Sequence, residues 1–462
     1  PASIDTTGMK AEDSPLDLSV VRASIVNIVT ESKKLWDEGQ QELATKLSQA
    51  RAQGITHLDI ADAIDYDNDF TIVFNRRISD KCGNWNFNIL QCTTEELIVV
   101  IARLFCAMGL PYTYNIPTDV FANFVIAAYL RYRNNPYHNF MHAVDVTQSV
   151  FVILSQWHAY HMFSADERFA LMLAAISHDL NHPGTNNIYH VKARTSLSAV
   201  FGKVGVLERY HCLSLFNLLA DPETNVLVNV SAASTKAIRH MAFQAILSTD
   251  MSVHVDMIEK VNLIIQDLRT THKELTNGLR LNSASPTLAY APLKPSASKP
   301  HNSHAPAATP ADVDPSSPIP PESPSASTPA LVEFPPCTLT PRCKGLLTPM
   351  HEYLAQELPH LGVFANHVEY TADTPIYLLA RKVPLSHKTI LLNLVLHAAD
   401  ISNPAKPWSV SKTWATRVVE EFFDQGDIES REGLPVSPNC VREEHKIPGI
   451  NLQFIDGIVS PL

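Results

Sequence analysis

The sequence has little of what marks several broad classes of protein. Its seven cysteines, at positions 82, 92, 106, 212, 337, 343 and 440, form no CxxC pair, so we expect reduced thiols rather than a disulfide framework. It has no long basic block, and 47 acidic residues outweigh 36 basic ones to give a formal charge of −11, which argues against a nucleic-acid partner. The longest apolar run, Leu97 to Leu110, contains Arg103 and is too short to span a membrane. With no signal peptide at its start, we expect a cytoplasmic protein.

Strand-like alternation is also scarce, and no repeat of fixed period is present. Apolar residues instead recur at helical spacing, which predicts an all-α fold. The expected helices are 18–52, 94–108, 118–132, 143–156, 166–177, 197–219 with a break, 232–247, 253–268, 387–400 and 411–425. We interpret the first as a core helix rather than a regulatory or dimerising one, because no sustained heptad follows. The acidic stretch 59–69 lacks the glycine and final glutamate of a calcium loop, which indicates a solvated turn.

Imidazoles and carboxylates gather at the polar ends of apolar helices in four places: His138 with His142, His178 with Asp179, Glu208 with His211, and Asp400. The spacing of four predicts that His138 and His142 share one helix face. For His178 and Asp179 alone, an ordinary capped helix end is an alternative, because Asp, Asn, Pro and Gly commonly stop helices. The recurrence favours a catalytic metal site with two histidine and two aspartate ligands, since a metal ion is the strongest partner for a charge in an apolar setting.

Three segments resemble the signatures of class I cyclic-nucleotide phosphodiesterases, a branch of the HD-type metal-dependent phosphohydrolases. They are Tyr137-His138-Asn139-x-x-His142-Ala143, His178-Asp179-x-x-His182-Pro183-Gly184-x-x-Asn187 and Ala399-Asp400-Ile401-Ser402-Asn403-Pro404. Similar too are Thr249-Asp250-Met251, Trp414 with the segment 420–427, and Phe454-Ile455-Asp456. The resemblance covers about Trp85 to Leu462 and implies a compact, multi-helix catalytic domain.

The resemblance implies a two-metal site that opens a 3′,5′-cyclic nucleotide to the 5′-nucleoside monophosphate. The zinc ligands would be His142, His178, Asp179 and Asp400. Asp179 would also bridge to a second ion, magnesium or alternatively manganese, and a metal-bound hydroxide would attack phosphorus. His138 would be the general acid that protonates the departing 3′ oxygen. Such an activity would end or shape cyclic-nucleotide signalling.

Further residues match family positions that support the reacting groups or bind the substrate. The supporting polar shell would comprise Tyr137, His182, Asn187, Glu208 and His211. The substrate-binding set would comprise Val418 and Phe454, which clamp the purine, with Met251, Asn403 and Asn451. Of the two cyclic nucleotides we expect cAMP rather than cGMP, although an amide that can rotate accepts either purine.

The sequence departs from the family pattern in the purine pocket. Asn451 stands where the family has a glutamine, so its amide reaches about 1.5 Å less far, the length of one methylene. Gln453 is no substitute, because two residues along a helix lead to about 200° round it. Base recognition is therefore expected to be weakened or shifted without loss of the metal chemistry. Asn181 also stands where many members have aspartate, which does not affect the metal ligands.

Composition and resemblance together predict four regions. They are an N-terminal helical or flexible region 1–70, the first part of the catalytic domain 71–282, a disordered insertion 283–345 and the second part of the domain 346–462. The insertion carries 15 of the 32 prolines, and an inert loop is favoured over a gate or a modified segment. Because the family domain usually continues beyond the equivalent of Leu462, we expect that the chain is truncated there.

Two other functions stay open. The chain could be an HD-type phosphohydrolase of another nucleotide, which the Tyr137-His138 and Phe454 features argue against. It could also be a cyclic-nucleotide sink or scaffold without catalysis, which the complete metal set argues against. The sequence leaves the oligomeric state open, a homodimer included.

Overall fold

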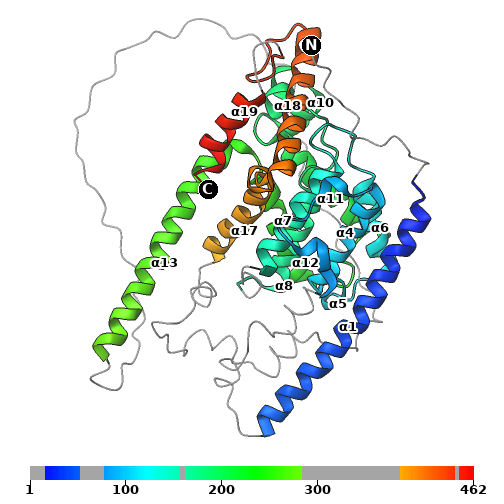
Figure 1. The fold of residues 1–462 in the computed structure, drawn as a ribbon, viewed down its shortest axis with the longest axis vertical. Helices are drawn as coiled ribbons and strands as arrows, with labels where there is room; N and C mark the ends of the chain where they lie inside the picture. Colours follow the sequence, from blue (N-terminus) through cyan, green and yellow to red (C-terminus); the bar gives the residue numbers. More distant parts are fainter. Residues whose placement is uncertain (1–15, 53–76, 157–161, 283–384, 443–446, 462) are drawn as a thin grey trace, which may run out of the picture. The chain divides into compact units, whose positions relative to one another are not determined.

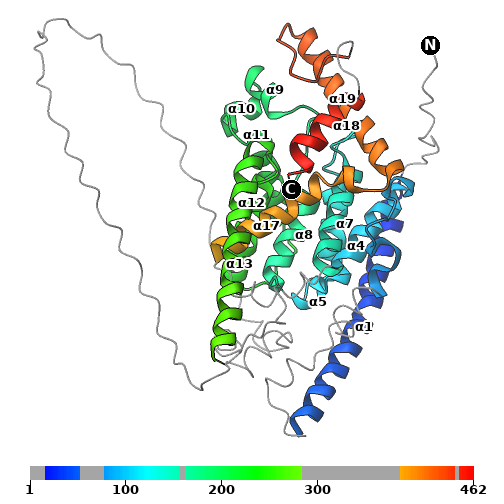
Figure 2. The ribbon, with the colours of Figure 1, turned by 60° about the vertical axis from the view of Figure 1, so that its left-hand side comes forward.

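Every regular element of the described chain is helical, which confirms the expected all-α class (Figures 1 and 2). The computed structural model describes residues 16–52, 77–156, 162–282, 385–442 and 447–461. The α-helices are α1 (Leu18–Ala52), α4 (Thr94–Ala107), α5 (Leu110–Thr113), α6 (Thr118–Tyr129), α7 (Phe140–Gln156), α8 (Ala165–Ser177), α9 (Asn187–Lys192), α10 (Ser196–Phe201), α11 (Val206–Ala220), α12 (Ala232–Leu247), α13 (His254–Asn282), α17 (Leu385–Asp400), α18 (Trp408–Arg431) and α19 (Ile447–Phe454). Short 3-10 turns are η2 (Asp80–Gly83), η3 (Ile89–Gln91), η5 (Met251–Val253) and η6 (Asn403–Ala405), and η7 (Ile455–Val459) is a π-helical turn.

Helix α8 is the central element of the core. It begins with a capping box, in which the Ser164 hydroxyl accepts from the backbone N–H of Glu167 and the Glu167 side chain accepts from the Ser164 N–H. Its residues from Phe169 to Ser177 are all buried, and it packs against α7, α12 and α17. Such all-round burial fixes the axis of α8, so that the polar residues following Ser177 leave the core at a defined place.

Helix α1 forms part of the same core. Its residues Val21, Ile25 and Val29 recur every four positions, and all three are buried where α1 packs on α4 and α6. This agrees with the interpretation of the segment as a core helix. None of the helices in the described parts of the chain is long and apolar enough to cross a membrane.

Several helix boundaries differ from those expected. The expected break in 197–219 lies between α10 and α11, where Gly202 and Gly205 have φ values of 87° and 59° that favour glycine. Helix α6 ends three residues early, and α13 continues to Asn282 rather than ending at residue 268. The short helices α9 and α19 were not predicted, because six and eight residues are too few to show a helical period.

Some expectations concern residues outside the described ranges. The acidic turn 59–69 and the insertion 283–345 both lie there, as does the start of the region 346–462. The division into four regions therefore stays a prediction.

Candidate active site

Two imidazoles and two carboxylates meet where α7, α8 and α17 bring their polar ends together. His142 lies in the first turn of α7, His178 caps the C-terminus of α8 and is followed by Asp179, and Asp400 is the last residue of α17. The Nε2 atom of His142 lies 3.0 Å from Asp400 Oδ1, 3.2 Å from His178 Nε2 and 3.6 Å from Asp179 Oδ2. The Nε2 atom of His178 lies 3.2 Å from Asp179 Oδ2 and 3.3 Å from Asp400 Oδ1.

These distances fit a set of metal ligands. An ion with bonds of about 2.0–2.2 Å to tetrahedral ligands places those ligands roughly 3.3–3.6 Å apart. His178 Nδ1 lies 2.8 Å from the carbonyl oxygen of Ala175 and therefore carries the proton, which leaves the Nε2 lone pair directed at the cluster. Burial acts to lower the pKa of His178, but Asp179 and Asp400 outweigh it and raise that pKa well above its ordinary value, so this buried group of atoms attracts positive charge. The residues present therefore fit a divalent ion such as zinc.

The two oxygens of Asp179 face different neighbours. Oδ2 belongs to the group with His142 and His178, whereas Oδ1 lies 3.7 Å from Nε2 of His211. Burial acts to raise the pKa of Asp179, but the adjacent His178 and further imidazoles outweigh it and hold that pKa well below its usual range. The carboxylate is therefore ionised and directed to two sides, as a carboxylate shared by two ions requires.

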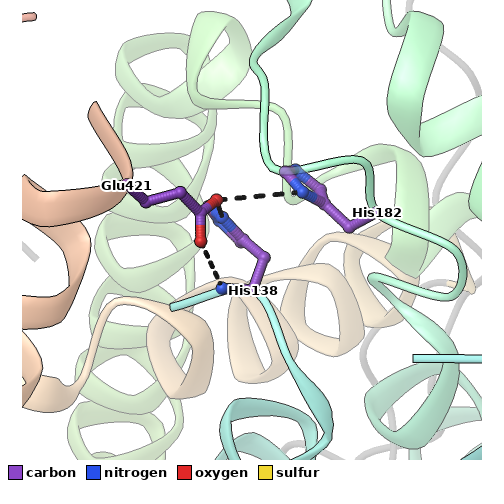
Figure 3. A group of neighbouring side chains, drawn as sticks. All are labelled: His138, His182 and Glu421. Atoms are coloured by element: carbon purple, nitrogen blue, oxygen red, sulfur yellow. Dashed lines mark hydrogen bonds and ion pairs between the residues drawn. The ribbon is translucent and has the colours of Figure 1, made fainter. Parts of the chain in front are cut away.

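His138 stands at the edge of this cluster and is held by Glu421 of α18 (Figure 3). Its Nδ1 lies 2.5 Å from Glu421 Oε1, and the backbone N–H groups of Tyr137 and His138 donate to Oε2 over 2.8 and 2.9 Å. Burial acts to lower the pKa of His138, but the carboxylates of Glu421, Asp179 and Asp400 outweigh it and raise the pKa to about 9. The imidazole is thereby kept protonated and able to donate.

The expectation that His138 and His142 share a helix face is wrong. Helix α7 begins at Phe140, so His138 precedes it. The two rings are 5.9 Å apart between centroids and nearly perpendicular, at 84°. The spacing of four residues thus misled, because it gives a common face only if both residues lie within the helix.

The predicted supporting residues His182 and His211 extend the line of imidazoles. The rings of His138 and His182 stack at 4.0 Å, and those of His182 and His211 lie 5.6 Å apart, at 21° in each case. His182 Nδ1 accepts from the N–H of Gly184, and His211 Nδ1 lies 2.7 Å from the Leu180 carbonyl. Burial, with the nearby His138, lowers the pKa of His182 well below its ordinary value, and burial lowers that of His211 to about 4. Both are therefore neutral beside a protonated His138.

Glu208 and Asn187 form a second polar group near Asp179. The Asn187 amide nitrogen donates to both oxygens of Glu208, over 3.1 and 3.0 Å. Burial raises the pKa of Glu208 to about 7, and Asp250 adds to the effect by its charge. Met251, a predicted substrate-binding residue, follows Asp250 in η5 and is exposed. With a pKa of about 7, the Glu208 carboxylate can exchange a proton near neutral pH.

Tyr137 and Asn403 are joined by a hydrogen bond behind the cluster. The Tyr137 hydroxyl donates to Asn403 Oδ1 over 2.6 Å, and the Asn403 amide nitrogen donates to Asp145 over 2.9 Å. Asn403 is buried, and both ends of its amide are engaged within the protein. Asp145 is in turn paired with the buried Lys406, at 3.4 Å. The structure thus places Asn403 within an internal network that fixes its orientation.

The predicted purine-binding residues lie on α18 and α19, which pack against each other. Val418 borders an apolar cluster formed by Val419, Phe423 and Ile450. The Asn451 amide nitrogen donates to the Ile447 carbonyl over 2.9 Å and to the Ala415 carbonyl over 3.5 Å, so its Oδ1 is the atom left for a ligand. Asn451 and Phe454 are half-buried whereas Gln453 is exposed, which agrees with the expected opposite faces.

Glu421 is a residue of the candidate site that the local sequence patterns do not single out. Its partner His138 lies 283 residues away in the chain, so no local spacing could join the two. A signal was nevertheless present, because Glu421 is seven residues after the buried Trp414 and four before Gln425. A carboxylate on the apolar face of an amphipathic helix requires a partner.

Comparisons with known proteins agree with this geometry. The family of 3′5′-cyclic nucleotide phosphodiesterases matches residues 137–289 and 355–462, more than half of the chain. The 3′,5′-cyclic-nucleotide phosphodiesterase regA of Dictyostelium discoideum is 24% identical over 390 residues, which cover 84% of this chain and 35% of the relative. The dual specificity calcium/calmodulin-dependent 3′,5′-cyclic nucleotide phosphodiesterase 1B of Homo sapiens is 25% identical over 379 residues, 81% of this chain and 49% of the relative. The chain thus spans half or less of the length of these relatives.

Solved structures show the same fold. The phosphodiesterase domain of the RhoPDE fusion protein from Salpingoeca rosetta superposes with a TM-score of 0.55 at 20% identity, and covers 84% of this chain and 88% of that one. LmjPDEB1 in complex with IBMX superposes with a TM-score of 0.53 at 20% identity and covers 84% of this chain. With the family match over both segments that carry the His/Asp cluster, the chain belongs to the 3′5′-cyclic nucleotide phosphodiesterase family.

Proposed function

We propose that this chain hydrolyses the 3′ phosphoester bond of a 3′,5′-cyclic nucleotide and yields the 5′-nucleoside monophosphate. The observation that carries the proposal is the convergence of His142, His178, Asp179 and Asp400, next to a protonated His138. The Nε2 atom of each of the two imidazoles lies within 3.0–3.6 Å of the other imidazole and of both carboxylates. A phosphodiester needs neutralisation of its charge, an oriented nucleophile and a proton for the leaving oxygen. These residues supply places for all three.

The metal site is proposed to take zinc, with a second ion, magnesium, on the other side of Asp179. Histidine nitrogens and carboxylate oxygens suit zinc. The second ion would be held by Asp179 and otherwise mainly by water, and magnesium prefers such oxygen donors. When bound, such ions neutralise the phosphate charge and lower the pKa of water. Around them Asn187 orients Glu208, whose pKa of about 7 lets it hold or pass a proton.

His138 is proposed to deliver its Nε2 proton to the departing 3′ oxygen. Glu421 engages Nδ1 and so directs Nε2 away from itself, while Tyr137 and His138 are both fixed to Glu421 through their backbone N–H groups. The orientation of the acid is therefore set by α18 rather than by α7. After the transfer, a neutral His138 regains a proton readily, because the neighbouring carboxylates raise its pKa.

Recognition of the base is proposed to favour cAMP by a small margin. Both Asn451 N–H bonds are directed to backbone carbonyls, so its Oδ1 faces a ligand. Adenine offers an amino group at C6, which an oxygen accepts, whereas guanine offers another oxygen there. One hydrogen bond discriminates weakly, so Phe454 and Val418 would supply most of the affinity by stacking on either purine.

The test is hydrolysis of cAMP and cGMP side by side, in magnesium and again after chelation, with His138→Ala as companion. We expect turnover that chelation abolishes and that His138→Ala lowers by about 10²- to 10⁴-fold. Absence of turnover in the wild type at full metal content would contradict the proposal and favour a nucleotide sink. Release of phosphate from a different nucleotide, with none from cAMP or cGMP, would favour another HD-type activity.

A further inference from the structure

Helix α18 carries a buried polar stripe, which we define as Glu421, Gln425 and Glu429. Their exposed fractions are 4%, 2% and 0%. A spacing of four places all three on one face of the helix. Glu421 holds the segment with Tyr137 and His138, but the proposed reaction gives no role to the other two. Buried polar groups require partners, and the partners of Gln425 point to such a role.

Gln425 is bonded on every side of its amide. Its Oε1 accepts from the backbone N–H of Asn186 over 2.8 Å, and its Nε2 donates to Asn186 Oδ1 over 3.2 Å and to Glu429 Oε1 over 3.0 Å. The two bonds with Asn186 resemble the pairing of two amides. Together they define the distance and the angle between the Gln425 amide and Asn186. Gln425 thus joins α18 to the segment that enters α9.

Glu429 fixes which way the Gln425 amide points. A carboxylate can only accept, so it must face the Nε2 group of Gln425 and leave Oε1 for Asn186. Burial acts to raise the pKa of Glu429, but bonds from Lys192 and Ser437 outweigh it and hold the pKa below its usual value. Lys192 Nζ lies 2.8 Å from Glu429 Oε1, and Ser437 donates through both its backbone N–H and its hydroxyl.

Gly426 allows this part of α18 to lie close to the segment around Cys440. A Cβ added at Gly426 would overlap the Cys440 carbonyl oxygen, which is sterically forbidden. The backbone of the Ser437–Cys440 segment therefore approaches α18 directly and closes over Glu429. The position of Gln425 is thus determined by packing as well as by hydrogen bonds.

Asn186 leads directly to the polar group at Glu208. It is the N-cap of α9, and its Oδ1 also accepts from the backbone N–H of Tyr189 over 3.0 Å. The next residue, Asn187, accepts from the Leu207 N–H over 2.9 Å and donates to both oxygens of Glu208. A displacement of Asn186 must therefore move the amide that orients Glu208.

We propose that Gln425 is a positioning residue, which holds Asn186 and thereby sets where Asn187 keeps the Glu208 carboxylate. Helix α18 then aligns two separate segments: Glu421 places the acid imidazole, and Gln425 places the carboxylate across the cluster. The part of the inference that concerns rate rests on the proposed function. The part that concerns position does not, and the two are measured separately.

Position is tested by hydrogen exchange of the backbone amides in 184–192, in the wild type and in Gln425→Met, which keeps the chain length of glutamine and loses its amide. The control is Thr224→Val, which removes a buried bond from the Thr224 hydroxyl to the Leu218 carbonyl away from α9. We expect exchange in this segment to accelerate roughly five- to tenfold in Gln425→Met and not in Thr224→Val. Equal exchange in Gln425→Met and the wild type would overturn the proposal.

A second variant approaches the contact from the other partner. Asn186→Ser keeps an N-cap side chain for α9 but loses the bond that Asn186 Oδ1 accepts from Gln425. The bond from the backbone N–H of residue 186 to Gln425 Oε1 remains, so exchange of the same segment should accelerate, but less than in Gln425→Met. If Gln425→Met fails to fold, the exchange measured in Asn186→Ser decides the question, and unchanged exchange in that variant overturns the proposal.

Rate is tested by a double-mutant cycle on kcat, with Gln425→Met and Asn187→Ala. Each single change should lower kcat by about 10- to 100-fold, as changes in the outer shell of a metal site do, while KM stays within about twofold. The double variant should lower kcat little further than either single change does, because both residues act through Glu208. Gln425→Met combined with Tyr137→Phe should instead be additive. Additive costs in the Asn187 cycle would overturn the proposed route, whereas a wild type without turnover would contradict the proposed function and leave the exchange result standing.

Discussion

The site has two regions that are built in different ways. The region that would carry the chemistry combines the buried His142, His178 and Asp179, from α7 and the end of α8, with Asp400 from α17, which lies more than 200 residues later in the chain. The region that would bind the base lies on the neighbouring helices α18 and α19, and its Asn451 is half-buried and bonded to the carbonyl at the start of its own helix. Figure 2 shows α19 beside α18.

The difference concerns how much each region is determined by the rest of the fold. His178 cannot move without breaking its bond to the Ala175 carbonyl in a helix buried on all sides, whereas Asn451 is fixed by one short bond and one of 3.5 Å. We therefore expect the chemical region to respond to substitution by large losses of rate. The base-binding region should respond by modest changes of KM.

The largest effect is expected for Asp179→Asn. The change keeps the shape of the side chain but removes the charge that faces both proposed ions. Because a metal ion contributes several kcal/mol to a phosphoryl-transfer barrier, kcat should fall by about 1000-fold or more. Steady-state hydrolysis of cAMP measures the loss. A variant that retained a tenth of the wild-type rate would show that Asp179 is not the shared ligand.

Glu421→Gln should shift the pH dependence of the rate. In the wild type the raised pKa of His138 keeps the acid form present below about pH 9, and activity is lost as the pH rises through that value. Removing the Glu421 anion lowers the pKa of His138, so the alkaline limb of kcat should move to lower pH, and kcat at neutral pH should fall by about 10- to 100-fold. Profiles of kcat between pH 6 and 10 measure the shift.

The matched control is Glu420→Gln. Glu420 is the exposed neighbour on the same helix and pairs with Arg442 rather than with a histidine. The alkaline limb of kcat in Glu420→Gln should coincide with that of the wild type. The assignment fails if both variants keep the wild-type limb, since the carboxylate of Glu421 would then not govern His138.

Asn451→Gln should sharpen recognition of the base. The longer side chain restores the methylene that this sequence lacks and carries the amide toward the purine. We expect KM to fall by about five- to tenfold, the value of one hydrogen bond, with kcat unchanged. Initial-rate measurements with cAMP and cGMP give the KM for each nucleotide and the ratio of the two values. An unchanged KM would indicate that residue 451 does not contact the base.

Gln453→Ala should have the smallest effect. Its side chain is exposed on the other face of α19, and surface substitutions usually change energies by less than about 0.5 kcal/mol. KM and kcat should therefore both stay within about twofold, in the same assay as Asn451→Gln. A tenfold rise in KM would break the comparison, because it would place Gln453 rather than Asn451 in the base-binding region.

The sequence predicts that the proposed metal ligands lie close together, and it does so for a physical reason. His178, Asp179 and Asp400 each follow a long apolar run, and burial of the run dictates that its polar end lies at the edge of the core. The contacts of His138 are harder to predict from the sequence. Its position depends on where α7 begins and on Glu421, a contact that only tertiary packing creates.

Short helices could not be predicted from the sequence for a related reason. Helix α9 has six residues, and its position follows from Gln425 and the N-cap Asn186 rather than from any apolar period. The same holds for the Asn403 amide, which is oriented by Asp145 from α7. Contacts between residues more than two hundred positions apart leave no local pattern in the sequence.

The metal centre is tested most directly by the metal content of the purified chain, measured by elemental analysis before and after dialysis. We expect at least one tightly held divalent ion per wild-type chain and the loss of this ion in Asp400→Asn. The ion content of Gln453→Ala should equal that of the wild type. Equal retention in Asp400→Asn and the wild type would contradict the assignment of His142, His178, Asp179 and Asp400 as the metal ligands.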